Sequence, residues 1–209
     1  MSTRPARILL AVPAAALAAA LGVTAALAAT TWTVKPGGKI TAKSGKVLLR
    51  DTKTGTQVSC ASSTVKITLK SGSGLPGVGI GSITSFTFGT CTGPLGTTFT
   101  LKNSSLPYRL NAVSYNAGTG TTTAKITGIH GVITGPSCSW TVDGTGATKD
   151  NGTITVTYVN STHKLKFLTT GGNLHIYRVI GCAGLIANGD PASGSGTATV
   201  TPAQTISSP

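Results

Sequence analysis

The side chains best suited to acid–base chemistry in this 209-residue chain are three histidines and four aspartates, and the sequence contains no glutamate. Asp143 and Asp150 bracket one predicted turn, so we expect their carboxyl groups to lie near each other. With His130 and His175 they are the candidates for a functional site. A nucleophilic triad needs a histidine and an acid that orients it, and a glycoside hydrolase needs two carboxyl groups that flank one bond.

The same residues also have a simpler structural interpretation. His130, His163 and His175 lie on separate predicted elements, and no two of them have the spacing of metal ligands. Aspartates beside turns commonly accept hydrogen bonds from nearby backbone amides. We therefore predict no catalytic residue, no metal site and no cofactor, and we favour a non-enzymatic protein. A cleft that held at least two of these histidines and aspartates within hydrogen-bond reach would favour an enzyme.

The four cysteines are expected to form disulfides. The sequence around Cys91 has the outline of a nucleophile elbow, but the elbow needs a following helix, and here Pro94 and a new strand pattern follow. An even number of cysteines in an exported chain indicates two bridges among Cys60, Cys91, Cys138 and Cys182. Three pairings are possible. We favour Cys60–Cys91 and Cys138–Cys182, because each pair spans one strand–turn–strand block.

The two tryptophans are candidates for stacking on sugar rings where they are exposed. Trp140 alternates with polar neighbours on a predicted strand, so we expect it in the core. Trp32 lies near the mature N-terminus, and we expect it to be the more exposed of the two.

The N-terminal segment has the features of a secretory signal peptide. Arg4 and Arg7 precede an uncharged run from Ile8 to Ala29, and Ala26-Leu27-Ala28 supplies small residues for cleavage after Ala28. An uncleaved membrane anchor is the alternative, because the run is just long enough to span a bilayer. We expect Sec-dependent export of residues 29–209 to the extracellular space or the cell wall, with no stable membrane anchor after cleavage.

The remaining sequence predicts an all-β fold. Val65 to Lys70 alternates apolar and polar residues, as a half-buried strand does, and no mature window is an amphipathic helix of useful length. Asn151-Gly152 is the strongest two-residue hairpin signal. We expect an antiparallel β-sandwich or barrel of about ten short strands, stapled by two disulfides. Residues 29–202 would form a single domain, and residues 203–209 a flexible tail.

The chain is strongly basic, with 17 Lys and Arg against four acids and a formal charge of +13. This charge can hold an exported protein near anionic cell-envelope polymers or glycans. Lysines on strands also protect sheet edges and keep a protein soluble, and we favour this second interpretation. No nucleic acid partner is expected, because the lysines are single, dispersed and not interleaved with aromatic residues.

Several segments resemble small secreted proteins of unknown function from actinobacteria such as streptomycetes. The resemblance covers most of the mature chain and is carried mainly by turn sequences. They are Thr31-Trp32-Thr33-Val34 before Pro36-Gly37-Gly38, Gly79-Ile80-Gly81-Ser82-Ile83-Thr84, Cys91-Thr92-Gly93-Pro94-Leu95-Gly96, Leu168-Thr169-Thr170-Gly171-Gly172-Asn173-Leu174-His175 and Thr199-Val200-Thr201-Pro202. The resemblance implies a source and export, and it implies no activity and no site.

Three functions are compatible with these features. The first is a secreted, non-catalytic extracellular or cell-wall-associated β-protein that acts as a binding or structural module. The second is a secreted hydrolase that acts on an envelope polymer through Asp143 or Asp150 and a histidine. The third is a cationic toxin or inhibitor directed at membranes, which the positive charge and the disulfides suggest. We expect the first.

Overall fold

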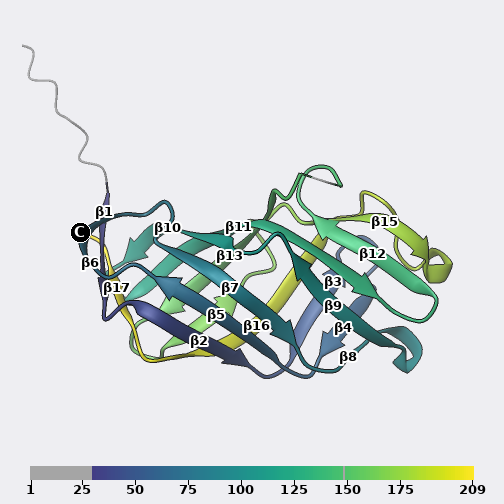
Figure 1. Cartoon of the computed structure of the whole chain (residues 1–209), viewed down its shortest axis with the longest axis horizontal. Helices are drawn as coiled ribbons and strands as arrows, with labels where there is room; N and C mark the ends of the chain where they lie inside the picture. Colours follow the sequence, from purple (N-terminus) through teal and green to yellow (C-terminus); the bar gives the residue numbers. More distant parts are fainter. Residues whose placement is uncertain (1–29, 148) are drawn as a thin grey trace, which may run out of the picture.

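The computed structural model describes residues 30–147 and 149–209, and the predicted signal peptide lies outside the described residues. The described chain is all-β, with antiparallel strands, no α-helix and two disulfides, as the sequence predicts (Figure 1). It contains 17 strands where about ten were expected. The number is higher partly because short glycine-containing segments such as Gly72–Pro76 also pair as strands.

The elements follow one another in chain order and are connected mostly by short turns. They are β1 (Thr31–Lys35), β2 (Gly38–Ser44), β3 (Val47–Asp51), β4 (Gln57–Cys60), β5 (Ser63–Leu69), β6 (Gly72–Pro76), β7 (Gly81–Phe88), β8 (Cys91–Thr92), the 3-10 turn η1 (Pro94–Gly96), β9 (Thr98–Ser104), β10 (Tyr108–Asn116), β11 (Thr121–Thr134), β12 (Cys138–Asp143), β13 (Gly152–Val159), β14 (Lys164–Phe167), β15 (His175–Gly181), the 3-10 turn η2 (Cys182–Gly184), β16 (Ala192–Thr201) and β17 (Thr205–Ser207).

Eight strands close into a ring, which we call the closed ring. Their order is β10, β7, β5, β2, β16, β14, β13 and β11, and β11 pairs again with β10. Alternate side chains point into the ring, so Val65, Ile67 and Leu69 of β5 are buried while Lys66 is exposed. The sequence left a sandwich and a barrel open, and this part of the molecule has the closed arrangement.

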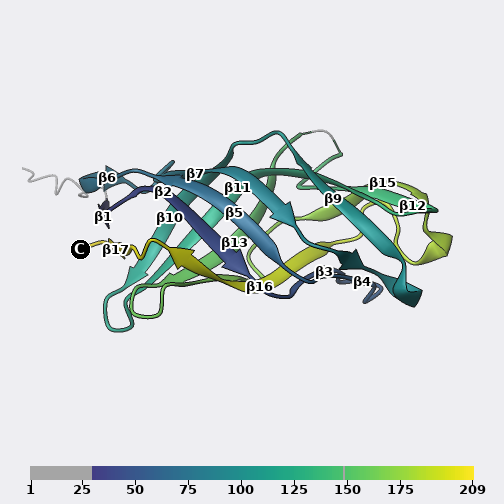
Figure 2. The ribbon, with the colours of Figure 1, turned by 60° about the horizontal axis from the view of Figure 1, so that its bottom comes forward.

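Two long strands connect the closed ring to the rest of the molecule. Residues 121–127 of β11 pair with β10 and β13, whereas residues 130–134 pair with β9. Residues 196–201 of β16 pair with β14 or β2, whereas residues 192–195 pair with β3. The second part, which we call the cystine half, contains these strand ends with β3, β4, β8, β9, β12 and β15. Figures 1 and 2 show the two parts end to end along the long axis.

Each part has its own hydrophobic core. The core of the closed ring is aliphatic and aromatic, and it includes Val34, Val65 and Val156. The core of the cystine half is built around Phe99 and Trp140, whose ring centroids are 5.3 Å apart in an edge-on arrangement. Trp140 is 8% exposed, which confirms the prediction that it lies in the core.

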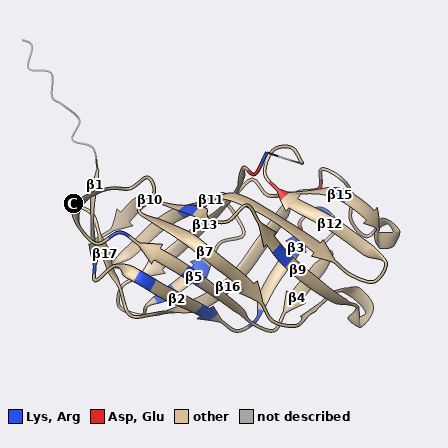
Figure 3. Cartoon of the chain, in the orientation of Figure 1, with Lys and Arg blue, Asp and Glu red and all other residues tan. Residues whose placement is uncertain are grey.

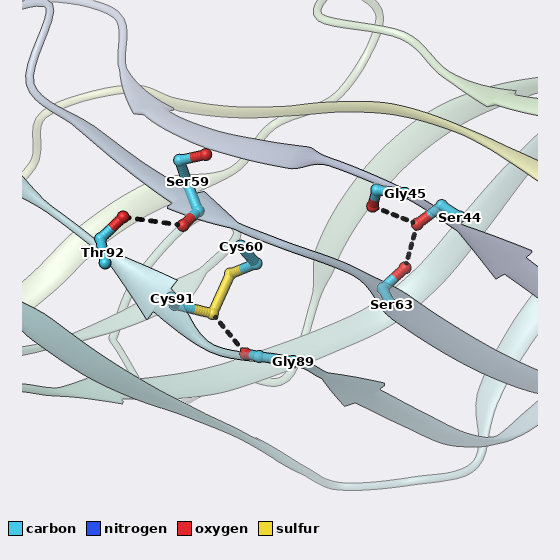
Figure 4. The surroundings of a disulfide bond; sticks show 8 residues. All are labelled: Ser44, Gly45, Ser59, Cys60, Ser63, Gly89, Cys91 and Thr92. Atoms are coloured by element: carbon cyan, nitrogen blue, oxygen red, sulfur yellow. Dashed lines mark hydrogen bonds between the residues drawn. A yellow bond between two sulfur atoms is a disulfide. The ribbon is translucent and has the colours of Figure 1, made fainter.

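Both disulfides lie in the cystine half and have the favoured pairing, Cys60–Cys91 and Cys138–Cys182. Cys60 lies directly opposite Cys91 between β4 and β8 (Figure 4). The first bridge lies near the point where β2 meets β5, whose Ser44 and Ser63 hydroxyls are 2.7 Å apart. The bridges indicate an oxidising environment for the folded chain. The described part of the chain has no helix of the length and apolar character needed to cross a membrane.

The C-terminal segment, which was expected to be a flexible tail over residues 203–209, contains a paired strand. Thr205–Ser207 forms β17, which pairs with β1 in a small third sheet, β17-β1-β6. Ile206 is 8% exposed, and its backbone N–H and carbonyl are both hydrogen-bonded to the Asn160 side chain. This strand was difficult to recognise in the sequence because the segment is short and follows a proline.

Asn151-Gly152 does not form the predicted hairpin. The flanking strands β12 and β13 are not paired with each other, because β12 pairs with β11 and β15 while β13 pairs with β11 and β14. Gly152 lies opposite Ile129 instead, and a Cβ atom at Gly152 would be 2.4 Å from the Ile129 carbonyl oxygen. Gly152 is therefore needed because the backbones of β11 and β13 approach closely there, and not because it forms a tight turn.

Candidate functional site

The structure brings together His130, Asp143 and Asp150, three of the predicted candidates. His130 Nδ1 is 2.7 Å from Asp143 Oδ2 and 3.1 Å from Asp150 Oδ1. His130 lies on β11, Asp143 is the last residue of β12, and Asp150 lies in the loop that leads to β13. The expectation that the two carboxyl groups lie near each other is confirmed, and the cluster adds a histidine from a third segment.

The strands position these side chains through a change of register. β11 has an irregularity between Thr127 and Ile129, where Gly128 adopts a φ of +85°. After Ile129, β11 leaves β13 and pairs with β9 and β12. His130 therefore lies where the strands diverge, next to the loop of residues 144–151.

Asp143 is the centre of the cluster and has no exposed surface. Its Oδ1 accepts hydrogen bonds from the backbone N–H groups of Gly144 at 2.6 Å and Asn151 at 3.1 Å. Its Oδ2 accepts one from the Asp150 N–H at 3.2 Å and contacts His130. Burial raises the pKa of Asp143, but the hydrogen bonds from His130 and these three amides together outweigh it, so its pKa lies below the ordinary value.

Two hydroxyl groups surround the cluster. The Tyr108 hydroxyl donates to the His130 carbonyl at 2.6 Å, and the Ser105 hydroxyl donates to Asp150 Oδ2 at 2.8 Å. Burial raises the pKa of Tyr108 to about 12, the hydrogen bond to His130 opposes this, and the charges of Asp150 and Asp143 add to it. Tyr108 therefore remains a neutral donor at physiological pH and helps to position the β11 backbone.

The cluster has the donor types of a metal site, with one ligand atom from each residue and all three atoms within 4.8 Å of one another. The four acceptor positions of the Asp143 carboxylate are already used by three amides and His130. A cation would have to replace the proton shared between His130 and Asp143. The arrangement fits a hydrogen-bonded clamp on the loop of residues 144–151 better than a preformed metal site.

The three side chains of the cluster are close together but differ in exposure. The side chains of His130, Asp143 and Asp150 are 15%, 0% and 48% exposed, so a substrate would reach mainly Asp150. In the described chain, no hydrogen bond joins the His130 ring to a serine, threonine or cysteine side chain. The arrangement can hold a proton between His130 and Asp143, and the nearby Ser105 hydroxyl donates to Asp150 and not to His130.

Of the other candidates, His175 lies directly opposite Asp143 in the pairing of β12 with β15, but in the described chain its ring makes no hydrogen bond to the cluster. His175 Nδ1 contacts the Asn173 carbonyl at 2.8 Å, and His163 Nδ1 lies 3.3 Å from the Tyr158 hydroxyl. Trp32 is 2% exposed, so the expectation that it is exposed is wrong. The neighbouring strands β6 and β17 enclose β1, and Trp32 points into the core of the closed ring with Val34.

Two further aspartates, Asp51 and Asp190, stabilise turns in the cystine half. Lys53 Nζ donates to Asp190 Oδ1 at 2.9 Å, and this hydrogen bond is the main reason that the pKa of Asp190 lies below its ordinary value. Asp51 Oδ1 accepts hydrogen bonds from the backbone N–H groups of Lys53 and Thr54. Asp51 and Asp190 are 3% and 2% exposed, so both carboxylates serve the structure of neighbouring turns.

A basic surface that the sequence did not predict covers four adjacent strands of the closed ring, β5, β2, β16 and β14. Its outward side chains are lysines and threonines, which alternate along β5 and β2, whereas the outward positions are threonines on β16 and lysines on β14. One row across the strands reads Thr64, Lys43, Thr199 and Lys164. We call this surface the Lys/Thr face, and its exposed lysines are Lys39, Lys43, Lys66, Lys164 and Lys166.

The Lys/Thr face carries no acidic side chain, because β5, β2, β16 and β14 contain no aspartate or glutamate. All four aspartates belong to β3, to β12 or to loops of the cystine half. Figure 3 shows red positions near β12 and its loops, whereas blue positions lie along the strands of the closed ring and also near β3 and β9 of the cystine half. The lysines appear dispersed in the sequence because the register that aligns them joins strands that are distant along the chain.

Comparison with family models, with curated proteins and with solved structures finds no match for this chain.

Proposed function

We propose that this chain is an exported, non-catalytic β-protein that binds an anionic polymer of the cell envelope through the Lys/Thr face. The observation that carries the proposal is the alignment of five exposed lysines on four neighbouring strands that contain no carboxylate. The predicted signal peptide over residues 1–28 and the two disulfides support export. The resemblance to secreted actinobacterial proteins supports a bacterial cell wall as the location.

The register explains how so many like charges share one surface. Lys43 lies directly opposite Thr64 and Thr199, and Lys66 lies opposite Thr41. Lys43 and Lys66 are therefore diagonal neighbours, about 7–8 Å apart between Cα atoms. Lys164 lies two strands from Lys43 in the same row, with Thr199 between them. A chain of phosphate or carboxylate groups would contact several ammonium groups at once, while threonine hydroxyls between them offer hydrogen bonds. Lys164 Nζ already donates to Thr199 Oγ1 at 2.6 Å in this way.

The proposal is tested by the retention of the oxidised protein on isolated cell walls. We expect the wild-type protein to be retained at low salt and to elute at moderate salt, since exposed charges are screened. The variant K43Q/K66Q/K164Q removes three charges from the Lys/Thr face and should lose most of this retention. The matched control K102Q/K149Q/R178Q removes three exposed charges elsewhere and should be retained like the wild type. Equal loss in both variants would show that only net charge matters.

A hydrolase is the second candidate, and the proximity of His130, Asp143 and Asp150 favours it. It would use Asp150, the most exposed of the three, as the group that meets the substrate. The test is release of soluble fragments from purified wall polymers by the wild type and by D150N. Release that D150N abolishes would support the hydrolase over the binding module.

A further inference from the structure

An apolar cavity of about 90 Å³ lies at the junction of the two hydrophobic cores. Phe167 and Ile154 reach it from the core of the closed ring, and Leu49 and Ile133 line it from the cystine half. Phe86 stacks against Phe167, with ring centroids 6.0 Å apart. The junction is where β11 and β16 pass from one part of the molecule to the other, so neither core fills it completely.

Two polar side chains at the wall of the cavity, those of Tyr108 and Asn103, already have partners. The Tyr108 hydroxyl donates to the His130 carbonyl, and the Asn103 amide donates to the Phe86 carbonyl. A water molecule needs two to four polar partners to occupy a buried space stably. The wall therefore suits a hydrocarbon group better than water.

Gly194 of β16 leaves this space open without a structural need for glycine. The inward residues of β16 become smaller toward the junction, from Val200 to Ala198, Gly196 and Gly194. A Cβ atom at Gly196 would lie 3.2 Å from Val47 Cγ2, so close packing explains that glycine. A Cβ atom at Gly194 would make only ordinary contacts, 3.4 Å to Ile154 Cδ1 and 3.7 Å to Leu49 Cδ2.

We propose that the cavity is a binding site for a small uncharged hydrocarbon group, either a free ring of the size of benzene or the end of an alkyl chain. A larger apolar cavity of about 150 Å³ with a similar lining stays dry and binds benzene. The position of Gly194 keeps the site at its present volume. The site is separate from the Lys/Thr face and does not depend on the proposed polymer binding.

The test is methyl NMR of the oxidised protein titrated with two uncharged probes, benzene for a free ring and octyl glucoside below its micelle concentration for an alkyl chain. We expect shifts at the methyl groups of Ile129, Ile133 and Ile154, which line the cavity. The probe whose titration saturates shows whether the site takes a free ring or the end of an alkyl chain. G194A should weaken its binding by about tenfold, because the added methyl group occupies part of the cavity. G45A is the matched control, since a Cβ atom there meets nothing within 4 Å.

V47I narrows the cavity from another strand and provides the same test if G194A does not fold. Weaker binding in either variant, with unchanged binding in G45A, supports the site. The proposal is overturned if neither probe shifts these methyl groups, or if G194A, V47I and G45A all bind as the wild type does.

Discussion

At the scale of single residues, Asp143 organises the loop between β12 and β13. Its buried carboxylate accepts hydrogen bonds from three backbone amides and contacts His130, and its pKa lies below the unfolded value of about 3.9. The folded state therefore binds fewer protons than the unfolded state at low pH. The stabilisation is complete above the unfolded pKa and is lost as the pH falls through the folded pKa.

We predict that D143N lowers the free energy of unfolding by about 1–3 kcal/mol at pH 7, because an amide cannot accept all of these hydrogen bonds. The difference from the wild type should shrink as the pH falls through the lowered pKa of Asp143 and the wild-type carboxylate becomes neutral. Urea unfolding over a series of pH values from 7 downward measures this. D150N is the control, and it should have a smaller effect because Asp150 is exposed. If D143N lowered the free energy of unfolding by the same amount at every pH, the role of the Asp143 carboxylate in holding the loop would be contradicted.

The proximity of Asp143 and Asp150 could be predicted, because both residues flank one loop. The contact with His130 could not, because it depends on the register of β11 with β12 and on the irregularity at Gly128. Trp32 was placed incorrectly for a similar reason. Its burial depends on pairing with β6 and β17, and β17 was not recognised as a strand.

At the scale of elements, β17 closes one end of the closed ring and covers its core. Ile206 is buried there, whereas its neighbour Thr205 is exposed. We predict that I206A lowers the free energy of unfolding by about 2–4 kcal/mol, the usual effect of removing a buried isoleucine side chain. T205A should change it by less than ~0.5 kcal/mol. Equal, small effects in thermal or urea unfolding would indicate that the C-terminal strand does not contribute to the core.

The individual strands were more predictable than the pairing between them. The alternation in Val65–Lys70 identified the buried face of β5, because burial of one face follows directly from a period of two. The order of strands around the closed ring was not predictable, since β2 pairs with both β5 and β16, which is distant in the sequence. The Lys/Thr face depends on this order and was missed for the same reason.

At the scale of the whole molecule, the two parts are stabilised differently. Both disulfides lie in the cystine half, and its core contains Cys60, Cys91 and Cys182, whereas the core of the closed ring contains no cysteine. The bridges enclose sequence separations of 31 and 44 residues. Each should stabilise the folded state by about 3–4 kcal/mol on the chain-entropy account.

We predict that reduction of both bridges accelerates hydrogen exchange in β4, β8 and β12 much more than in β5 and β2. Hydrogen exchange with and without reductant, read at single amides or short peptides, checks this. A uniform acceleration over both parts would mean that the molecule unfolds as one cooperative unit.

The Lys/Thr face is the feature of the whole molecule from which the proposed function follows. The most direct measurement is the affinity for a phosphate polymer of defined length as a function of salt concentration, for the wild type, K43Q/K66Q/K164Q and the control K102Q/K149Q/R178Q. If the face binds the polymer, the slope of log affinity against log salt should be less steep by about 2 in the face variant, since three contacts are lost, and unchanged in the control. Equal slopes in all three proteins, or no binding by the wild type at low salt, would contradict the account.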